Sequence, residues 1–295
     1  MKNISAYFTP SSIDEAVRLL RRQPGRGKFI AGGTNLVVEK DPQLDFLVDV
    51  RKLGLDYIVE DGDVIRIGAA ATIEKIYRSE TLQRLAGGLF AQVAACFGSK
   101  QIRNMATIGG NVAEGRSAAD MIPALLVTDA QISLVGEAER VAPVAEFLRR
   151  GGGAILQKEL IKEFRISKVF ERASGAFLKH GKTREDIAVV SVAATVIMQE
   201  GRCEQARLAL GAVAPTPIRI PEAEAALTGH IPTSELIEQA ADAVMRVIQP
   251  MDNFRASAAF RKEISRTYVK RAFASCFKSL SQNNASSGAG DVTTD

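Results

Sequence analysis

The sequence has few of the residues that carry metal or nucleophilic chemistry. Its 295 residues include three cysteines, two histidines and no tryptophan. Cys96, Cys203 and Cys276 lie far apart and form no Cys-x-x-Cys pair. This spacing argues against a zinc site, against an iron–sulfur cluster held by this chain alone, and against a disulfide framework. With His180 and His230 alone, no Ser-His-Asp or Cys-His site can be assembled. We therefore expect a bound organic cofactor to carry any chemistry.

Long apolar runs and concentrated charge are also absent. No stretch of about 18 apolar residues predicts a transmembrane helix, and Met1–Ser5 does not begin a secretory signal. Together with the cysteine spacing, this leads us to expect a cytoplasmic protein. The net charge is +4, but the basic residues are scattered, so no nucleic-acid partner is expected. The hydrophobic content of 46% is enough for a packed core in about two domains.

Local patterns predict an α+β fold. Ser12–Glu15 fits a capping box that opens a helix ending near residue 24. Asp61-Gly62-Asp63 lies between two β-rich runs and predicts a hairpin. A second hairpin is expected around Glu200-Gly201, between strands at Ile187–Met198 and Cys203–Val213.

The other expected elements follow from periodicity and turn residues. We expect Gln101–Asn111 to be a loop, and Ser117–Asp120 to be a capping box that opens a helix. A domain boundary is expected near residues 168–175, and the Ser-, Gly-, Asn- and Thr-rich tail 281–295 should be disordered. Further helices are expected at Thr81–Phe97, Met121–Val127, Pro221–Leu227, Ser234–Ile248 and Ala256–Ser279, and further strands at Lys28–Ala31, Phe46–Val50, Gln131–Val135, Glu159–Ile166 and Gly175–Lys179.

Two glycine pairs stand out, Ala31-Gly32-Gly33-Thr34-Asn35 (the first Gly-Gly segment) and Thr107-Ile108-Gly109-Gly110-Asn111 (the second Gly-Gly segment). Glycine lets the backbone adopt positive φ and approach a ligand closely, and consecutive N–H groups in such a turn can form an anion-binding nest. The threonines and asparagines add short polar side chains. One such turn is usually structural, whereas two suit the two phosphates of a dinucleotide. Neither segment fits the Rossmann or Walker pattern, so the residues themselves indicate no more than a diphosphate site.

These segments and their surroundings resemble a known family. The two segments resemble the flavin-diphosphate motifs of the FAD-binding (medium) subunit of molybdenum hydroxylases, which include xanthine dehydrogenase and carbon monoxide dehydrogenase. The resemblance covers about residues 4–280 in order and spacing. Its other landmarks are Gln101-Ile102-Arg103-Asn104, Ser117-Ala118-Ala119-Asp120, Ile122-Pro123-Ala124-Leu125-Leu126, Glu185-Asp186-Ile187-Ala188-Val189-Val190-Ser191-Val192-Ala193 and Ala214-Pro215-Thr216-Pro217-Ile218-Arg219.

The resemblance implies a fold and a set of cofactor contacts. The fold is an FAD-binding domain of the vanillyl-alcohol-oxidase-like (PCMH) type over residues 1–170, with subdomains of about 1–55 and 56–170 and FAD extended between them. A smaller α+β domain would follow over 171–280. No catalytic residue and no metal ligand is implied. The implied FAD contacts are Ala31, Gly32, Gly33, Thr34, Asn35, Leu36, Thr107, Ile108, Gly109, Gly110, Asn111, Asp120, Ile161 and Lys179.

Three of these contacts have ordinary structural alternatives. By resemblance, Asp120 contacts the adenosine end of FAD, but it could instead cap a helix. Ile161 matches an adenine contact, and core packing is an equal alternative. Lys179 matches a lysine near the flavin that could stabilise negative charge on the reduced ring, or it could be a solvated strand lysine.

The sequence departs from the family pattern in two places. Asn35 stands where the first motif often has aspartate, so a donor and an acceptor remain while the charge is lost. The stretch Glu114-Gly115-Arg116 lacks an expected proline and brings two charged residues close to the second motif. Arg116 could pair with phosphate or could point to solvent.

The resemblance implies an electron-transfer role in a complex. A [2Fe-2S] small subunit and a molybdopterin large subunit would be the partners, NAD+ or another molecule the acceptor, and a dimer of heterotrimers the assembly. The substrate would belong to the large subunit, with a xanthine-dehydrogenase-like system favoured on overall resemblance. Two alternatives stay open. One is a self-contained flavin oxidase, although no His or Cys lies near Gly32 or Gly33 to tether FAD. The other is an assembly subunit that has lost its flavin.

Overall fold

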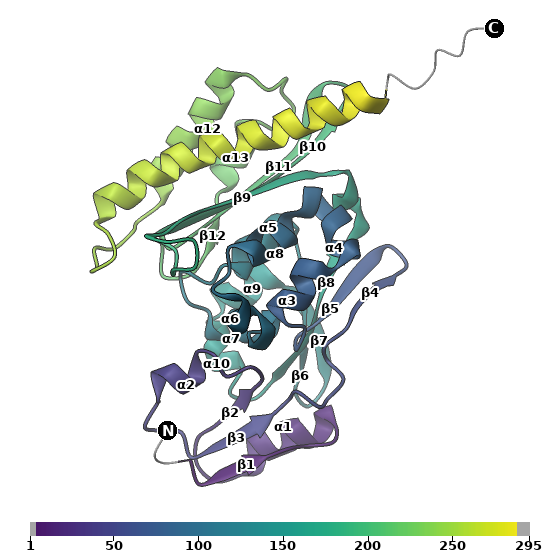
Figure 1. The fold of residues 1–295 in the computed structure, drawn as a ribbon, viewed down its shortest axis with the longest axis vertical. Coiled ribbons are helices and arrows are strands. Elements are labelled where there is room, and N and C mark those ends of the chain that lie inside the picture. The colour runs from purple at the N-terminus through teal and green to yellow at the C-terminus, as the bar shows by residue number, and fades with distance from the viewer. Residues whose placement is uncertain (1–3, 288–295) are drawn as a thin grey trace, which may run out of the picture.

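The computed structural model describes residues 4–287 and contains three β-sheets with helices around them (Figure 1). The sheets have three, five and four strands and follow one another along the long axis of the molecule, with the N-terminal part at one end (Figure 1). Helices and strands are mixed along the chain, so the α+β class is confirmed. The domain boundaries at residues 55 and 170 stay predictions.

The N-terminal part is a parallel sheet of order β1-β3-β2 with one helix on each face. Helix α1 begins at the predicted cap, where Ser12 Oγ accepts a hydrogen bond from the Glu15 N–H at 3.2 Å. Because side chains alternate along a strand, Phe46 packs on the α1 side while Leu47 packs with Leu36 of α2. The elements are β1 (Ala6–Phe8), α1 (Ile13–Arg22), β2 (Gly27–Ile30), α2 (Leu36–Glu39) and β3 (Phe46–Asp49).

The central part is an antiparallel sheet of order β4-β5-β8-β6-β7 packed against a layer of short helices. The predicted Asp-Gly hairpin is confirmed, since β4 and β5 pair around Asp61-Gly62-Asp63 with Gly62 at φ 58°. The elements are β4 (Ile58–Asp61), β5 (Val64–Gly68), α3 (Ile73–Arg78), α4 (Glu80–Arg84), α5 (Leu89–Ala95), α6 (Lys100–Met105), α7 (Ile108–Glu114), α8 (Met121–Val127), β6 (Gln131–Val135), β7 (Glu139–Pro143), α9 (Val144–Arg149), α10 (Gly152–Ile155) and β8 (Leu160–Ser167).

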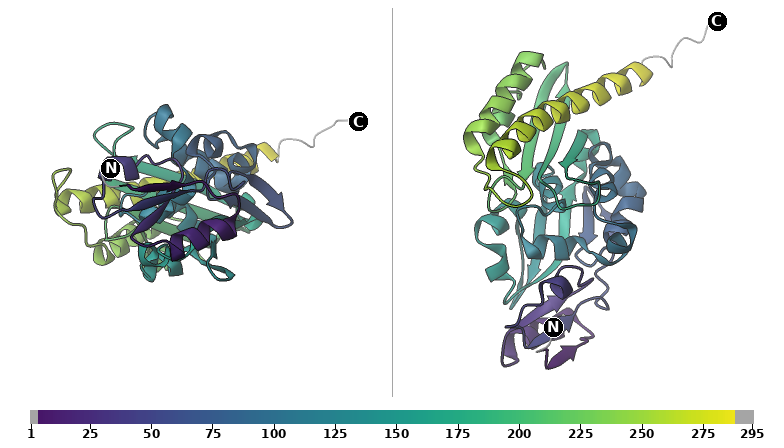
Figure 2. Two further views of the ribbon diagram at one scale, coloured as in Figure 1. Left: turned by 90° about the horizontal axis from the view of Figure 1, so that it is seen from below. Right: turned by 60° about the vertical axis from the view of Figure 1, so that its left-hand side comes forward.

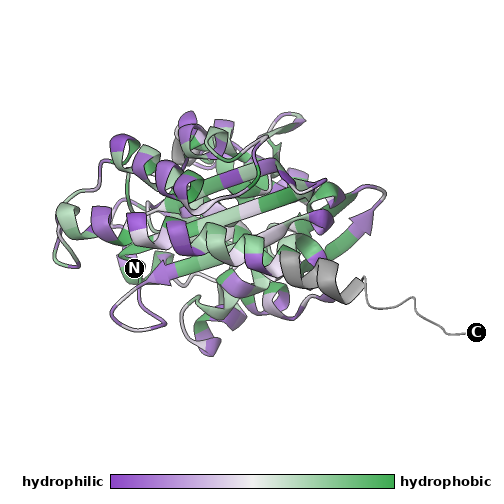
Figure 3. Ribbon diagram, turned by 90° about the horizontal axis from the view of Figure 1, so that it is seen from above, coloured by the Kyte–Doolittle hydropathy of each residue, from purple (hydrophilic) through white to green (hydrophobic). Residues whose placement is uncertain are grey.

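The C-terminal part is an antiparallel sheet of order β12-β11-β10-β9. Helices α12 and α13 cover one face (Figure 2), and α8 lies against the other, where Thr195 Oγ1 donates to the Val127 carbonyl at 2.9 Å. Figure 3 shows mostly hydrophobic strands beneath helices of mixed character. The elements are β9 (Ser174–His180), β10 (Val190–Gln199), β11 (Arg202–Gly211), β12 (Ile218–Arg219), α11 (Pro221–Ala225), α12 (Ser234–Val247) and α13 (Ala258–Ser287).

The single helix predicted over Thr81–Phe97 is wrong. The chain forms α4, a 3₁₀ turn over Leu85–Gly88 and then α5. Ala86, Gly87 and Gly88 all have positive φ, a conformation that a right-handed helix cannot contain. The Gln92 side chain bonds to the carbonyls of Gly87 and Gly175, both at 3.1 Å, so the break brings this turn against β9.

The loop predicted over Gln101–Asn111 is also wrong, because this region forms α6 and α7. Ser99 Oγ caps α6 by accepting from the Ile102 N–H at 3.3 Å, and Thr107 caps α7. The Thr107 cap offsets the low helix propensity of Gly109 and Gly110 in α7.

The capping box predicted at Ser117–Asp120 does not form. Asp120 itself has helical dihedral angles and makes no cap bond. The Met121 N–H at the start of α8 instead donates to Asn111 Oδ1 at 3.1 Å. A long-range partner therefore replaces the local cap.

The last helix is longer than predicted. α13 continues to Ser287, so the expectation of disorder is wrong for residues 281–287. The rest of that predicted tail, 288–295, lies outside the described residues.

Candidate functional site

The first Gly-Gly segment forms the connection between β2 and α2. Gly33 has φ 65°, a left-handed conformation that favours glycine and turns the chain into α2. A Cβ on Gly32 would overlap the backbone carbonyl of Met105 at the end of α6. Gly32 therefore permits close contact with the second Gly-Gly region, while Gly33 makes the turn.

This segment leaves a row of backbone donors without partners. Within the described residues, the N–H groups of residues 32–36 make no hydrogen bond. The side-chain Nδ2 of Asn35 is buried and also has no partner. Buried or clustered donors normally find an acceptor, and a run of free N–H groups around a turn is suited to an anion. The nest predicted from the sequence is therefore available at the first segment.

The second Gly-Gly segment is built differently, because it is the first turn of α7. Ile108 N–H donates to Ala71 O at 3.1 Å, and Gly109 N–H donates to Ala69 O at 2.8 Å. Gly110 N–H donates to Thr107 Oγ1 at 3.0 Å, and the Asn111 N–H also bonds to Thr107. A nest of free N–H groups is thus a wrong prediction here.

The two glycines of the second segment have different surroundings. A Cβ on Gly109 would come within 2.6 Å of the Ala69 carbonyl oxygen. A Cβ on Gly110 would approach only Thr107 Oγ1, at 3.0 Å. Gly109 thus fits against the central sheet, and Gly110 presents a bare surface where a ligand can approach.

Asp120 and Lys179 form a buried ion pair beside the second segment. Lys179 Nζ lies 2.8 Å from Asp120 Oδ2 and donates to the Cys96 carbonyl at 2.9 Å, and the two side chains are 4% and 9% exposed. Burial raises the pKa of Asp120, and the charge of Lys179 opposes that change. Asp120 Oδ1 is buried without a partner. The alternatives of a helix cap for Asp120 and a solvated strand lysine for Lys179 are both wrong.

Direct contacts connect most of the candidate residues into one region. Gly32 lies against Met105, which closely precedes the second segment, and Asn111 bonds to the residue after Asp120. Asp120 in turn pairs with Lys179 on β9. Leu36 and Ile161 lie in hydrophobic cores, Leu36 with Leu44 and Leu47, and Ile161 in the central core.

The charged residues near the second segment do not simply face solvent. Arg116 has a side chain that is 52% exposed, and it pairs with Glu39 of α2 and approaches Glu114 with 3.9 Å between Nε and Oε2. Glu39 is a contact that the sequence did not indicate, because it lies 77 positions away and no local pattern marks it.

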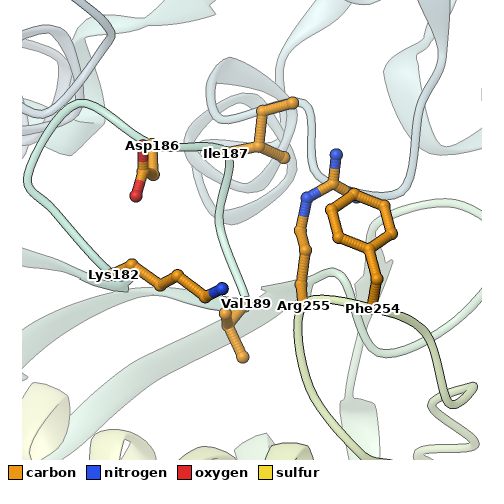
Figure 4. A pocket seen from close by; sticks show the side chains of 6 residues that line it. All are labelled: Lys182, Asp186, Ile187, Val189, Phe254 and Arg255. Carbon is orange, nitrogen blue, oxygen red and sulfur yellow. The ribbon is translucent and has the colours of Figure 1, made fainter.

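A surface cavity of about 260 Å³ lies beyond the end of β9 (Figure 4). The guanidinium of Arg255 stacks over the ring of Phe254 at 4.5 Å from its centroid, and Phe254 is 83% exposed. The sequence did not single out this cavity, since it joins two loops distant in the chain. Its lining residues are Lys182, Asp186, Ile187, Val189, Phe254 and Arg255.

The described part of the chain has neither a metal-binding cluster nor a membrane-spanning helix. Within residues 4–287, no group of three or more His, Cys, Asp or Glu side chains could hold a metal ion. None of the helices described is both long and apolar enough to cross a membrane.

Comparison with known families gives two matches that together cover most of the chain. The family described as the FAD binding domain in molybdopterin dehydrogenase matches residues 2–168. The family described as the CO dehydrogenase flavoprotein C-terminal domain matches residues 176–276.

Individual relatives are similar over nearly their whole length. The 6-hydroxypseudooxynicotine dehydrogenase complex subunit alpha of Paenarthrobacter nicotinovorans is 32% identical over 279 residues, covering 91% of this chain and 93% of the relative. The xanthine dehydrogenase FAD-binding subunit of Escherichia coli O157:H7 is 29% identical over 282 residues, covering 92% and 95%. A solved structure of carbon monoxide dehydrogenase from Hydrogenophaga pseudoflava matches with a TM-score of 0.87 at 28% identity, covering 93% of this chain and 98% of that one.

Proposed function

We propose the function of this chain from one premise, that it belongs to the family of FAD-binding domains in molybdopterin dehydrogenases. Its cofactor is accordingly FAD, and the chain is an oxidoreductase subunit of the carbon monoxide and xanthine dehydrogenase type. The finer proposal is that it passes electrons from iron–sulfur clusters on a partner subunit to NAD+ or another acceptor. One observation supports the cofactor site on which this function depends: the first Gly-Gly segment, which is rich in free donors, lies against the region of the second segment.

The residues present fit the cofactor. The free N–H groups of residues 32–36 and the unpartnered Asn35 amide supply donors for a diphosphate, and they do so without a charged side chain. Gly110 leaves room for close approach from the other side. The full set proposed to contact FAD is Ala31, Gly32, Gly33, Thr34, Asn35, Leu36, Thr107, Ile108, Gly109, Gly110, Asn111, Asp120, Ile161 and Lys179.

Lys179 and Asp120 are proposed to place charge near the cofactor. Bound FAD supplies the electron-carrying chemistry, and the chain's own residues position it and adjust its electrostatic surroundings. Lys179 is held by two acceptors, Asp120 Oδ2 and the Cys96 carbonyl, so its ammonium group has a fixed location. The remaining oxygen of Asp120 lacks a donor, which a hydroxyl of FAD would provide. Because the two side chains lie 2.8 Å apart, both would contact the same part of an extended FAD, so the adenosine contact expected for Asp120 and the flavin contact expected for Lys179 are not both compatible with this geometry.

The partners are proposed from the same family membership. A [2Fe-2S] small subunit and a molybdopterin large subunit would complete the electron path, in a dimer of heterotrimers in the cytoplasm. For the acceptor, the cavity beyond β9 offers Lys182 and Arg255 as cations against one carboxylate, Asp186, and an exposed aromatic ring at Phe254, features that would suit an anionic dinucleotide such as NAD+. The substrate of the complex is proposed to bind the large subunit.

The purified chain tests the proposal directly. After reconstitution with FAD it should show a flavin absorption spectrum and no turnover of small alcohols or heterocycles. The flavin is then reduced chemically and mixed with NAD+. Reoxidation of the flavin that is faster than in a control without NAD+ would establish NAD+ as acceptor.

Two outcomes would contradict the proposal in different ways. Absence of any flavin band after reconstitution would favour a flavin-free assembly subunit. Reduction of the flavin by a small alcohol without partner subunits would favour a self-contained oxidase.

A further inference from the structure

Two ion pairs connect the N-terminal part of the chain to the remainder. Within residues 4–287, the ion pairs that cross from residues 4–55 to later ones are Arg21–Glu137 and Glu39–Arg116. The first joins α1 to the turn between β6 and β7. The second joins the last residue of α2 to the segment just after α7. It therefore links the far ends of the two short helices that start at the Gly-Gly segments.

We propose that Glu39 and Arg116 form a clasp that holds the two Gly-Gly segments together around the FAD diphosphate and slows FAD release. This inference rests on the proposed function, because it assumes that FAD lies between these segments. Arg116 and Glu39 act here as positioning residues through their attraction for each other. Neither needs to touch the cofactor.

The short helices make the clasp effective. Glu39 ends the four-residue α2, which at 1.5 Å per residue places it about 6 Å from the first segment. Arg116 follows α7 and lies five residues after Asn111, the last residue of the second segment. A rigid element this short transmits movement directly. Any separation of the two segments that lets a diphosphate leave must also pull Glu39 away from Arg116.

The Arg116 side of the clasp is anchored. The Arg116 carbonyl accepts from the Ala119 N–H at 3.0 Å, and the next carbonyl, of Ser117, accepts from the Ala212 N–H at 2.6 Å. The first bond closes a turn within the segment after α7, and the second ties that segment to the end of β11 in the C-terminal sheet. On the other side, α2 contributes only Leu36 to a small core, and Val38 is 74% exposed. Opening therefore moves α2 rather than Arg116.

Glu114 gives Arg116 a second carboxylate when the clasp opens. It lies on the same segment, with 3.9 Å between its Oε2 and Arg116 Nε. The guanidinium thus keeps a neighbouring negative charge in both states. Because the Arg116 side chain is half exposed, the ion pair should contribute modestly, and we expect its loss to change a rate about two- to fivefold.

The test measures FAD release from the reconstituted full chain. Flavin fluorescence after rapid dilution reports the dissociation rate, and absorption reports occupancy. Glu39→Gln and Arg116→Gln should each speed release about two- to fivefold. The double variant should be no faster than either single variant, because both remove the same interaction. Glu114→Gln is the matched control. It removes the carboxylate that Arg116 meets in the open state and leaves the Glu39–Arg116 pair intact, so release should not become faster. Glu137→Gln removes the other crossing ion pair.

The outcomes distinguish the clasp from direct phosphate binding by Arg116, and they distinguish failure of the clasp from failure of the proposed function. Unchanged release in Glu39→Gln, with comparable melting temperatures of all apo-variants, would overturn the clasp. If Arg116→Gln speeds release while Glu39→Gln slows it, Arg116 binds the phosphate directly and Glu39 only competes, which also overturns the clasp. Failure of the wild-type chain to retain FAD would instead overturn the proposed function, before any variant is compared.

Discussion

At the scale of single residues, the four glycines of the two Gly-Gly segments have distinct roles. Gly33 is needed for its positive φ, and Gly32 and Gly109 are needed because backbone carbonyls lie where a Cβ would be. Gly110 has neither constraint, since only Thr107 Oγ1 lies close to a Cβ built there. In the second pair, therefore, Gly109 serves packing, whereas Gly110 leaves an open surface beside the segment.

Valine substitutions should separate these roles. Gly109→Val pushes against the Ala69 carbonyl, so the apo-protein should lose about 1–3 kcal/mol of unfolding free energy, the usual effect of overpacking. Gly110→Val should leave the apo-fold within about 1 kcal/mol of wild type, because valine favours a helix more than glycine does and only Thr107 Oγ1 lies close to the new Cβ. The same change should weaken FAD binding at least about tenfold. Urea unfolding and FAD titration measure the two effects. Full FAD affinity in Gly110→Val would show that this glycine does not face the cofactor.

The sequence and its resemblance indicated the candidate residues, but not how they are held. Short motifs such as the Gly-Gly segments can be recognised because they place special backbone demands within a few residues. The Lys179–Asp120 pair joins residues 59 positions apart, and Glu39–Arg116 joins residues 77 apart. Such pairs depend on tertiary contact, and no periodicity or spacing in one sequence marks them.

At the scale of secondary-structure elements, predictions succeeded where the signal was local. Both Asp-Gly and Glu-Gly hairpins are confirmed, because two or three turn residues determine them. Strand β1 was not predicted, since it has three residues and pairs in parallel with β3 some forty positions later. Helices α6 and α7 form where a loop was predicted, because the Ser99 and Thr107 caps stabilise two short helices and α7 tolerates its two glycines.

The central sheet contains a buried polar cluster that should make its stability depend on pH. Glu163 on β8 is fully buried and is bonded by Arg66, Arg165 and Tyr57. Burial alone would raise the pKa of Glu163, but the hydrogen bonds from these three groups hold it below its usual value of 4.5. For Tyr57, burial and then the bond to Glu163 raise the pKa to about 12.

The sign of the expected pH effect follows from the lowered pKa. A carboxyl with a depressed folded-state pKa contributes stability that is fully present above about 4.5 and is lost as the pH falls through the folded value. Urea unfolding between pH 3 and 7 should therefore show a loss of unfolding free energy below about pH 4.5. Glu163→Gln should be about 1–3 kcal/mol less stable at pH 7 and should lose part of that acid dependence.

Glu137→Gln provides the comparison for this experiment. Its side chain is 82% exposed on the turn between β6 and β7, so it should follow the wild-type pH profile closely. If Glu163→Gln keeps the full acid dependence of the wild type, other carboxylates determine acid unfolding.

At the scale of the whole molecule, the N-terminal part is joined weakly to the rest. Between residues 4–55 and the later described residues there is one hydrogen bond, from Ala70 N–H to Leu55 O at 2.8 Å, besides the two ion pairs. Their shared hydrophobic packing involves Ala70, Val135 and Leu160. The large central and C-terminal cores, by contrast, are connected through α8, which packs on β10 and β11. If FAD binds between the two Gly-Gly segments as proposed, it would add a further connection between the N-terminal part and the remainder.

FAD should therefore protect the N-terminal part most strongly. The N–H groups of residues 32–36 have no partner in the protein, so in the apo-form their amide hydrogens should exchange rapidly. With FAD at 100 times its Kd, any opening that releases the cofactor becomes about 2.7 kcal/mol costlier, which slows exchange through that opening about 100-fold.

Hydrogen–deuterium exchange measured by mass spectrometry, with and without FAD, should show this change in peptides spanning residues 28–40. Peptides from β10 in the C-terminal sheet should change little, because that strand is paired on both sides and does not border the first segment. Equal protection of both regions would mean that FAD stabilises the chain as one cooperative unit, and no protection of residues 28–40 would remove the first Gly-Gly segment from the binding site.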